Sequence, residues 1–234
     1  MIRVENLKKV YGGRTVLNIP EISIEKGESF GLVGNNGAGK TTFFRLILDL
    51  IRADSGRVLS LGKDVSKTEE WKSYTGSYLD EGFLIDYLTP REYFLFVGKL
   101  NGMSPGDVEQ FTENMKSFFG GNILEEKNYL RQLSKGSQKK VGIAAALMME
   151  PEILILDEPF SNLDPTSLFQ LKKLLKALQQ KKNICMLISS HDLNHVTEVC
   201  QRIVVLHEGD IVHDLETNKN TLKELEAFFA VKGD

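Results

Sequence analysis

Apolar residues along the chain cluster into short runs of strand length, and longer stretches with helical spacing separate these runs. Two strands joined by the Gly12-Gly13 pair are predicted within residues 1–27. Helices are predicted through most of 83–149, over 168–178 and over 221–230. Further strands are predicted at 29–33, 58–61, 76–79, 153–156, 184–188 and 203–206. Strands that alternate with helices favour an α/β fold with a mostly parallel sheet covered on both faces.

The helical stretch 83–149 interrupts the series of predicted strands. We therefore expect a single domain over 1–234, in which 1–82 and 150–234 form the core and 83–149 forms an inserted helical subdomain. Most of five aromatic residues near the start of this stretch are expected in the subdomain core: Phe83, Tyr87, Tyr93, Phe94 and Phe96.

Composition is that of a soluble globular protein, with 41% hydrophobic and 26% charged residues in 234. A net charge of -3 lacks the basic balance typical of nucleic-acid binding, although a local basic patch is compatible with it. No apolar run approaches the roughly 20 residues that span a bilayer, and the first residues carry no signal-peptide core. Cys185 and Cys200 have no metal or redox spacing, so we expect buried free thiols, consistent with a reducing cytoplasm.

The segment 34–42 fits the phosphate-loop pattern G-x-x-x-x-G-K-[ST]. The predicted strand 29–33 precedes it, and the apolar-rich run 43–48, which can open as a helix, follows it. A glycine-rich turn with a chance lysine is the alternative, and both flanks favour the phosphate loop. The predicted nucleotide-binding residues are Gly34, Asn35, Asn36, Gly37, Ala38, Gly39, Lys40, Thr41 and Thr42.

The residue types of this loop explain the chemistry. Glycines let the backbone wrap closely round an anion, and backbone N–H groups at the helix N-terminus then point at phosphates. In such a loop Lys40 can reach the β- and γ-phosphates, and the Thr41 hydroxyl can ligate Mg²⁺.

A second motif, which is acidic, follows the apolar run 153–156, where Asp157 and Glu158 precede Pro159. Carboxylates at the carboxyl end of a buried strand lie at the sheet edge where ligands bind in open α/β sheets. Asp157 suits Mg²⁺, bound directly or through water, and Glu158 suits general-base work on an attacking water. A solvated acidic turn is the alternative, and the phosphate loop favours the catalytic role.

The chain resembles the ATP-binding subunit of ABC transporters over nearly its whole length. Residues 34–42 resemble the Walker A motif and 153–159 the Walker B motif, which alone indicate only a P-loop NTPase. Residues 133–138 resemble the signature motif, 161–164 the D-loop and 189–192 the switch-histidine loop. The resemblance implies a P-loop NTPase fold of the ABC ATPase type, with a mostly parallel sheet, N-terminal antiparallel strands and an inserted helical subdomain.

Within the signature motif, Ser134 can cap the helix that follows, and a free glycine amide there forms an anion site. The resemblance implies that this loop closes in trans on ATP held by another subunit, although an ordinary helix cap explains it equally well locally. The residues assigned to the signature loop are Ser134, Lys135, Gly136 and Ser137.

Three further residues receive roles from the resemblance. His191 follows a strand at the same sheet edge as Glu158, and it could bind the γ-phosphate or orient Glu158. Tyr11 falls where the family places an aromatic that stacks on adenine, and a strand aromatic is the alternative. Asp164 belongs to the D-loop.

The chain departs from the family pattern at three positions. Lys135 and Ser137 replace the usual glycine and glutamine of the signature, and Ser137 is too short to guarantee the contacts of glutamine. Lysine at this point resembles the branch that exports drugs, antibiotics and polysaccharides, with a solvated lysine as the alternative. Glu81 stands where the family's Q-loop has glutamine, and it can still bind Mg²⁺ or position water.

We therefore predict an ATPase that uses ATP and Mg²⁺, with Glu158, His191 and Glu81 as catalytic residues and Thr41, Asp157 and Glu81 as metal ligands. The resemblance implies a head-to-tail dimer, of identical or paired ATPase chains, that holds two ATP molecules. It would drive a separate integral membrane permease, in export rather than import, from the cytoplasmic face of the membrane. Residues 83–97 would border the permease groove, where an exposed aromatic would suit an anchor.

Two other classes of function remain open at this point. A non-transport ABC ATPase acting on nucleic acid or ribosomes would be expected to carry a long coiled-coil insertion or a second cassette, and this chain has neither. No nucleic-acid partner is therefore expected. A nucleotide-dependent switch with little turnover is disfavoured by the carboxylate of Glu158.

Overall fold

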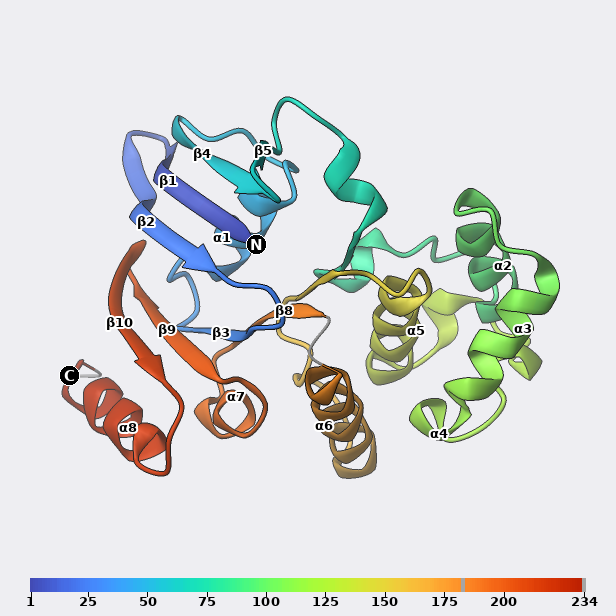
Figure 1. The fold of residues 1–234 in the computed structure, drawn as a ribbon. Helices are drawn as coiled ribbons and strands as arrows, with labels where there is room; N and C mark the ends of the chain where they lie inside the picture. The colour runs from blue at the N-terminus through green and yellow to red at the C-terminus, as the bar shows by residue number, and fades with distance from the viewer. Residues whose placement is uncertain (182–183, 233–234) are drawn as a thin grey trace.

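Two β-sheets, one above the other in Figure 1, form the body of the protein, and a group of helices projects from one end. The computed structural model describes residues 1–181 and 184–232. The first sheet is antiparallel, with strand order β2-β1-β4-β5. Its strands are β1 (Ile2–Tyr11), β2 (Arg14–Ile24), β4 (Ser55–Ser60) and β5 (Lys63–Asp64).

The second sheet has the order β10-β9-β3-β8-β7-β6 and is parallel except for β10. Val33 pairs with Ser190, and Leu156 pairs with Ile188, so neighbouring strands end at nearly the same level. The strands are β3 (Ser29–Val33), β6 (Thr75–Tyr78), β7 (Ile153–Leu156), β8 (Cys185–Ser190), β9 (Arg202–His207) and β10 (Asp210–Glu216).

Helix α1 (Lys40–Ile47) follows β3 and packs between the two sheets with its two phenylalanines, Phe43 and Phe44. On the other side of the parallel sheet lie α5 (Lys135–Leu147), α6 (Pro165–Gln180) and α7 (Leu193–Val199). The remaining helices are α2 (Pro90–Leu100), α3 (Pro105–Asn114), α4 (Lys116–Phe119), α8 (Thr221–Lys232) and short 3₁₀ turns at Glu70–Ser73, Glu81–Phe83, Ile123–Glu125 and Leu130–Gln132.

Strand β7 illustrates why the central strands are apolar throughout. Ile153 and Ile155 belong to the core shared with the antiparallel sheet, whereas Leu154 and Leu156 belong to the core under α5, α6 and α7. Successive side chains of a strand point to opposite faces, so a strand buried on both faces needs an apolar residue at every position.

Helix α5 lies unusually close to β6 because two glycines face the contact. A Cβ atom on Gly76 would lie 1.9 Å from the carbonyl oxygen of Ala146. A Cβ atom on Gly142 would lie 2.3 Å from the ring of Tyr78. A larger residue at either position would displace the helix or the Tyr78 ring, so the two glycines allow α5 to pack directly against β6.

The sequence pattern predicted most of these elements. All the expected strands are present, with bounds that agree or differ by at most three residues, and the helices at 168–178 and 221–230 lie within α6 and α8. The pattern missed β5, β10 and α7. Cys185 and Cys200 are buried free thiols, as expected. The division into a core and a subdomain at 83–149 stays a prediction.

The expectation for the five aromatic residues was wrong. Tyr93 and Phe94 are buried, but Phe83, Tyr87 and Phe96 are exposed. Phe83 and Tyr87 lie before α2 in a 3₁₀ turn and a loop, where no helical face directs them inward. Within the described residues, no helix combines the length and apolarity needed to cross a membrane.

Candidate functional site

The phosphate loop lies where β3 ends and α1 begins. Three positions of the loop require glycine. Gly37 and Gly39 have φ of 84° and 109°, which other residues rarely adopt, and a Cβ atom on Gly34 would lie 2.3 Å from the carbonyl oxygen of Leu206. Helix α1 starts at Lys40 with no side-chain cap on its first N–H groups. Uncapped N–H groups at a helix N-terminus bind anions, so the loop has the geometry of a phosphate site.

The Lys40 side chain is buried inside this loop. Its Nζ donates hydrogen bonds to the carbonyl oxygens of Gly34 (2.6 Å) and Asn35 (3.4 Å). The same Nζ lies 3.3 Å from Oε1 of Glu158, which comes from the end of β7. The two sequence motifs therefore meet at one ion pair.

Asp157 is buried beside the first turn of α1. Its Oδ2 accepts a hydrogen bond from Thr41 Oγ1 at 2.5 Å, and its Oδ1 accepts one from the hydroxyl of Ser189. Burial raises the pKa of Asp157, and the bonds from Ser189 and Thr41 and the charge of Lys40 oppose that rise. A carboxylate held by two hydroxyls at this position is well suited to attract a cation.

Glu158 occupies a backbone conformation that non-glycine residues rarely adopt, with φ of 47°. Its N–H donates to Ser189 Oγ at 2.9 Å. Its Oε2 lies 2.8 Å from His191 Nδ1 and 3.3 Å from the backbone nitrogen of His191. The carboxylate therefore lies between Lys40 and His191, and such a conformation costs about 1–3 kcal/mol unless the surroundings fix it.

The structure brings Lys40, Thr41, Asp157, Glu158 and His191 together. Ser189, which binds both Asp157 and Glu158, was not assigned a role from the sequence. The signal for it was a hydroxyl residue at the end of an otherwise apolar buried strand. A buried hydroxyl needs a hydrogen-bond partner, and polar groups at the end of the neighbouring strand can provide one.

The signature loop lies apart from the phosphate loop of the same chain. Ser134 Oγ accepts a hydrogen bond from the N–H of Ser137 at 3.1 Å, which confirms the predicted cap of α5. Lys135 is exposed. A Cβ atom on Gly136 would lie 3.1 Å from the carbonyl oxygen of Asn162, so this loop packs against the D-loop segment. Within the described chain, no hydrogen bond or ion pair joins residues 134–137 to residues 34–42.

For three other predicted residues the structure shows only local contacts, so their roles stay predictions. Asp164 caps α6 through the N–H groups of Thr166 and Ser167, and the hydrogen bond from the Ser167 hydroxyl is the main cause of its lowered pKa. Tyr11 is exposed at the end of β1, with the Lys9 ammonium 5.0 Å from its ring centroid. Glu81 is half-buried in the 3₁₀ turn after β6.

Glu81 nevertheless influences the pKa of the same buried lysine as the two Walker B carboxylates. Burial lowers the pKa of Lys139, and the charges of Glu81, Glu158 and Asp157 oppose that shift, in this order. The charge of Glu81 therefore acts on the same buried ammonium as the charges of Asp157 and Glu158.

No group of three or more histidine, cysteine, aspartate or glutamate side chains is arranged to hold a metal within 1–181 and 184–232. Beside phosphates, Mg²⁺ is bound by a hydroxyl and a carboxylate of the protein, with waters and the phosphates themselves as the further ligands. Thr41 and Asp157, whose oxygens lie 2.5 Å apart, fit that description.

Comparison with known proteins agrees with this geometry. The chain matches the model of the ABC transporter family over residues 17–161. The linearmycin resistance ATP-binding protein LnrL of Bacillus subtilis is 34% identical over 214 residues, which cover 91% of this chain and 68% of LnrL. The methionine import ATP-binding protein MetN 2 of Bacillus anthracis is 33% identical over 225 residues, which cover 92% of this chain and 66% of MetN 2.

A solved structure of an ATP-binding subunit of an ABC transporter superposes with a TM-score of 0.83 at 26% identity, covering 100% of this chain and 95% of that one. The fold and the site thus define an α/β protein of the P-loop class. The chain belongs to the ABC transporter family and is an ATP-binding subunit of this family, which hydrolyses ATP.

The raised pKa of Asp157 leads to a stability prediction. The folded protein binds a proton at Asp157 more tightly than the unfolded chain does, so the contribution of this group to stability falls as pH rises through the window above its ordinary pKa of 3.8. At neutral pH, Asp157→Asn should therefore leave the melting temperature unchanged or raise it by a few degrees, at about 2–4 °C per kcal/mol. It should also weaken the Mg²⁺-dependent part of ATP binding.

Calorimetric melting at pH 7 and at pH 4 measures the first effect, and the gain should shrink at the lower pH. A clear fall in melting temperature at pH 7 would mean that the hydrogen bonds of the ionised carboxylate outweigh its desolvation.

Proposed function

We propose that ATP is hydrolysed at the loop 34–42 with Glu158 as general base. The observation that carries this proposal is the Glu158 carboxylate, 3.3 Å from Lys40 Nζ and 2.8 Å from His191 Nδ1, beside the phosphate loop. The loop amides and Lys40 bind the β- and γ-phosphates. Glu158 accepts a proton from the attacking water, and His191 holds the carboxylate toward it.

We propose that Thr41 and Asp157 hold Mg²⁺. The Glu81 carboxylate is proposed to contribute to the metal site through a bridging water. The ion supplies charge neutralisation of the β- and γ-phosphates when it is bound. Tyr11, at the exposed end of β1, is proposed to stack on the adenine ring.

We propose a head-to-tail dimer with two ATP molecules between the chains. Support comes from the N-terminus of α5, whose signature-loop amides lie apart from the phosphate loop of their own chain. Such a helix end favours an anion from another molecule. A second copy of the chain, or a related ATPase chain, would supply the matching phosphate loop.

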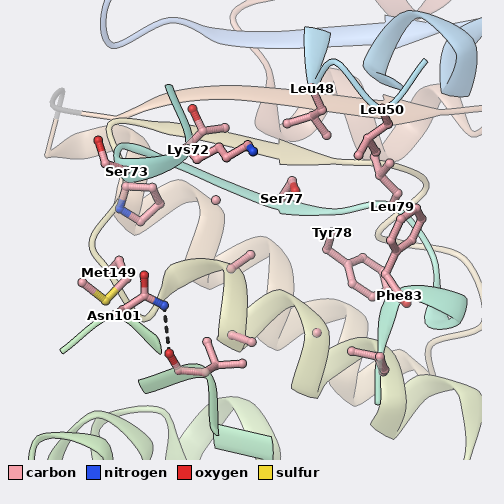
Figure 2. Close-up of a pocket in the computed structure, with 18 of the residues that line it drawn as sticks. Leu48, Leu50, Lys72, Ser73, Ser77, Tyr78, Leu79, Phe83, Asn101 and Met149 are labelled. Carbon is pink, nitrogen blue, oxygen red and sulfur yellow. Dashed lines mark hydrogen bonds between the residues drawn. The ribbon is translucent and has the colours of Figure 1, made fainter. Parts of the chain in front are cut away.

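The membrane partner is proposed to bind a pocket between β6, α2 and α5 (Figure 2), with a volume of about 360 Å³. Leu50 and Phe83 lie toward one end of the pocket and Met149 toward the other, and all three side chains are exposed. A short amphipathic helix of an integral membrane permease would cover these apolar side chains, with Phe83 as the aromatic anchor.

The proposed direction of transport is export, and the proposed location is the cytoplasmic face of the membrane. Identity alone does not separate export from import, because LnrL and MetN 2 are similarly related to this chain. The support for export is Lys135 in the signature loop, together with the relation to LnrL, a protein named for linearmycin resistance.

Glu158→Gln should keep ATP binding and lower turnover by about 10²–10⁴-fold, because the amide keeps the shape of the side chain and removes the base. The same variant should accumulate an ATP-bound dimer. Steady-state phosphate release and sedimentation with and without ATP measure both effects. Turnover close to that of the wild type would exclude Glu158 as the base.

Ser134→Arg and Lys40→Ala should each abolish hydrolysis, the first by blocking the partner's phosphate and the second by removing the phosphate-binding cation. An equal mixture of the two chains should recover up to about a quarter of wild-type turnover, because half of the dimers are mixed and each contains one intact site.

The matched control mixes Ser134→Arg with a chain that carries both substitutions, and this mixture should stay inactive. Full activity of Ser134→Arg on its own would mean that Ser134 is only a helix cap.

Leu50→Asp should reduce co-purification of an integral membrane protein from gently solubilised membranes, because a carboxylate in an apolar contact remains unpaired. Leu61→Asp is the matched control, since the two leucines are equally exposed, at 49% and 47%, and Leu61 lies outside the pocket. Equal recovery of the membrane protein with both variants would contradict the proposed docking site.

A further inference from the structure

A buried lysine lies on α5, the signature helix, which begins with the signature loop. Its contacts have no role in the proposed ATPase mechanism. Lys139 lies one turn inside α5 and is 3% exposed. Its Nζ donates to the carbonyl oxygens of Glu158 (2.8 Å) and Ser161 (2.9 Å) and to the Ser161 hydroxyl (2.7 Å). All three donors of the ammonium are therefore used, and the partners are two carbonyls and a hydroxyl rather than a carboxylate.

The segment that Lys139 binds has an unusual backbone. Glu158 and Asn162 have φ of 47° and 60°, although neither is glycine. The hydroxyl and the backbone N–H of Ser161 also donate to the Glu158 carbonyl oxygen, at 2.9 Å and 3.3 Å, so three donors converge on that oxygen. A left-handed residue of this kind persists only where its surroundings fix it, and Lys139 is a large part of those surroundings.

The same helix contacts this segment a second time, at its first turn. Gly136 packs against the carbonyl oxygen of Asn162, where an added Cβ atom would lie at 3.1 Å. The signature loop and the segment 158–162 are therefore joined at two points, one made by packing and one by a buried ammonium.

We propose that Lys139 is a positioning residue that makes the signature helix and the segment carrying the Glu158 carboxylate move as one unit. A contact between the signature loop and nucleotide held by a partner chain would then be transmitted to the carboxylate of the chain's own site. Lys139 thereby links the two ATP sites of the proposed dimer. The inference rests on the proposed function in two respects, namely that Glu158 is the base and that the signature loop contacts nucleotide held by a partner chain.

The test replaces Lys139 by methionine, which has a similar length and no hydrogen-bond donors. In the purified full chain, Lys139→Met should lower kcat by about 10- to 100-fold, the scale of a displaced catalytic group. The dissociation constant for ATP should stay within about threefold of the wild type, because the phosphate loop is untouched. A role in folding alone would not separate kcat from ATP affinity in this way.

Lys172→Met is the matched control. The Lys172 side chain is also shielded, at 15% exposure, and its ammonium pairs with Glu198 at 2.7 Å on α7. This variant should leave both kcat and ATP affinity unchanged.

Ser161→Ala provides a milder variant that decides the matter if Lys139→Met fails to fold. It removes one acceptor of Lys139 and one donor to Glu158, so kcat should fall several-fold with ATP affinity retained. In a folded double variant, kcat should fall by less than the product of the two single-variant reductions, because both substitutions act through the same backbone segment.

Wild-type turnover in a folded, ATP-binding Lys139→Met chain would overturn the inference, and so would fully multiplicative effects with Ser161→Ala. The outcome for Glu158→Gln keeps the two proposals apart. If Glu158→Gln is inactive and Lys139→Met is active, only the positioning role fails. If Glu158→Gln is active, the proposed base itself is wrong.

Discussion

The candidate site depends on one constraint, the common end of three parallel strands at one edge of the sheet. β3, β7 and β8 are buried on both faces, so polar side chains have room only where the strands stop. At that point the backbone loses its ladder partners and side chains replace them: the N–H of Glu158 donates to Ser189 Oγ rather than to a carbonyl. The phosphate loop, the acidic pair and the histidine meet because their strands end at nearly the same level.

The buried carboxylate of Asp157 lies at this edge at a cost in stability. Desolvation raises its pKa, and two hydroxyls and Lys40 recover only part of the loss. A hydrophobic residue would pack there more simply. The proposed Mg²⁺ beside the phosphates would offset this loss, because a nearby divalent cation favours the ionised form of a carboxylate.

Helix α5 connects the sheet edge with the outer part of the molecule. Gly76 and Gly142 let it approach β6 more closely than any other residue would allow, and its first turns contact the segment after β7. A helix fixed at both levels transmits displacement rather than absorbing it, because packed interfaces have few intermediate arrangements. The signature loop lies at the N-terminus of α5, and residues nearer its C-terminus, Gly142, Ala145 and Ala146, line the pocket of Figure 2.

The sequence alone determined the features that depend on neighbouring residues. Strand and helix periods, the strand–loop–helix context of the phosphate loop and the cap by Ser134 are local properties, and a local pattern records them. β5 and β10 escaped detection because one is two residues long and the other lies mostly half-exposed at the sheet edge, without a continuous apolar run.

Only the tertiary structure decided which distant residues meet. The partners Lys40 and Glu158 lie 118 positions apart, Ser189 binds the two residues that follow β7, and Lys139 reaches carbonyls that carry no side-chain signal at all. The exposure of Phe83 and Tyr87 likewise depends on where a turn leaves the sheet. Strand order and register set these contacts, and they are fixed by the packing of the whole chain rather than by the residues beside each position.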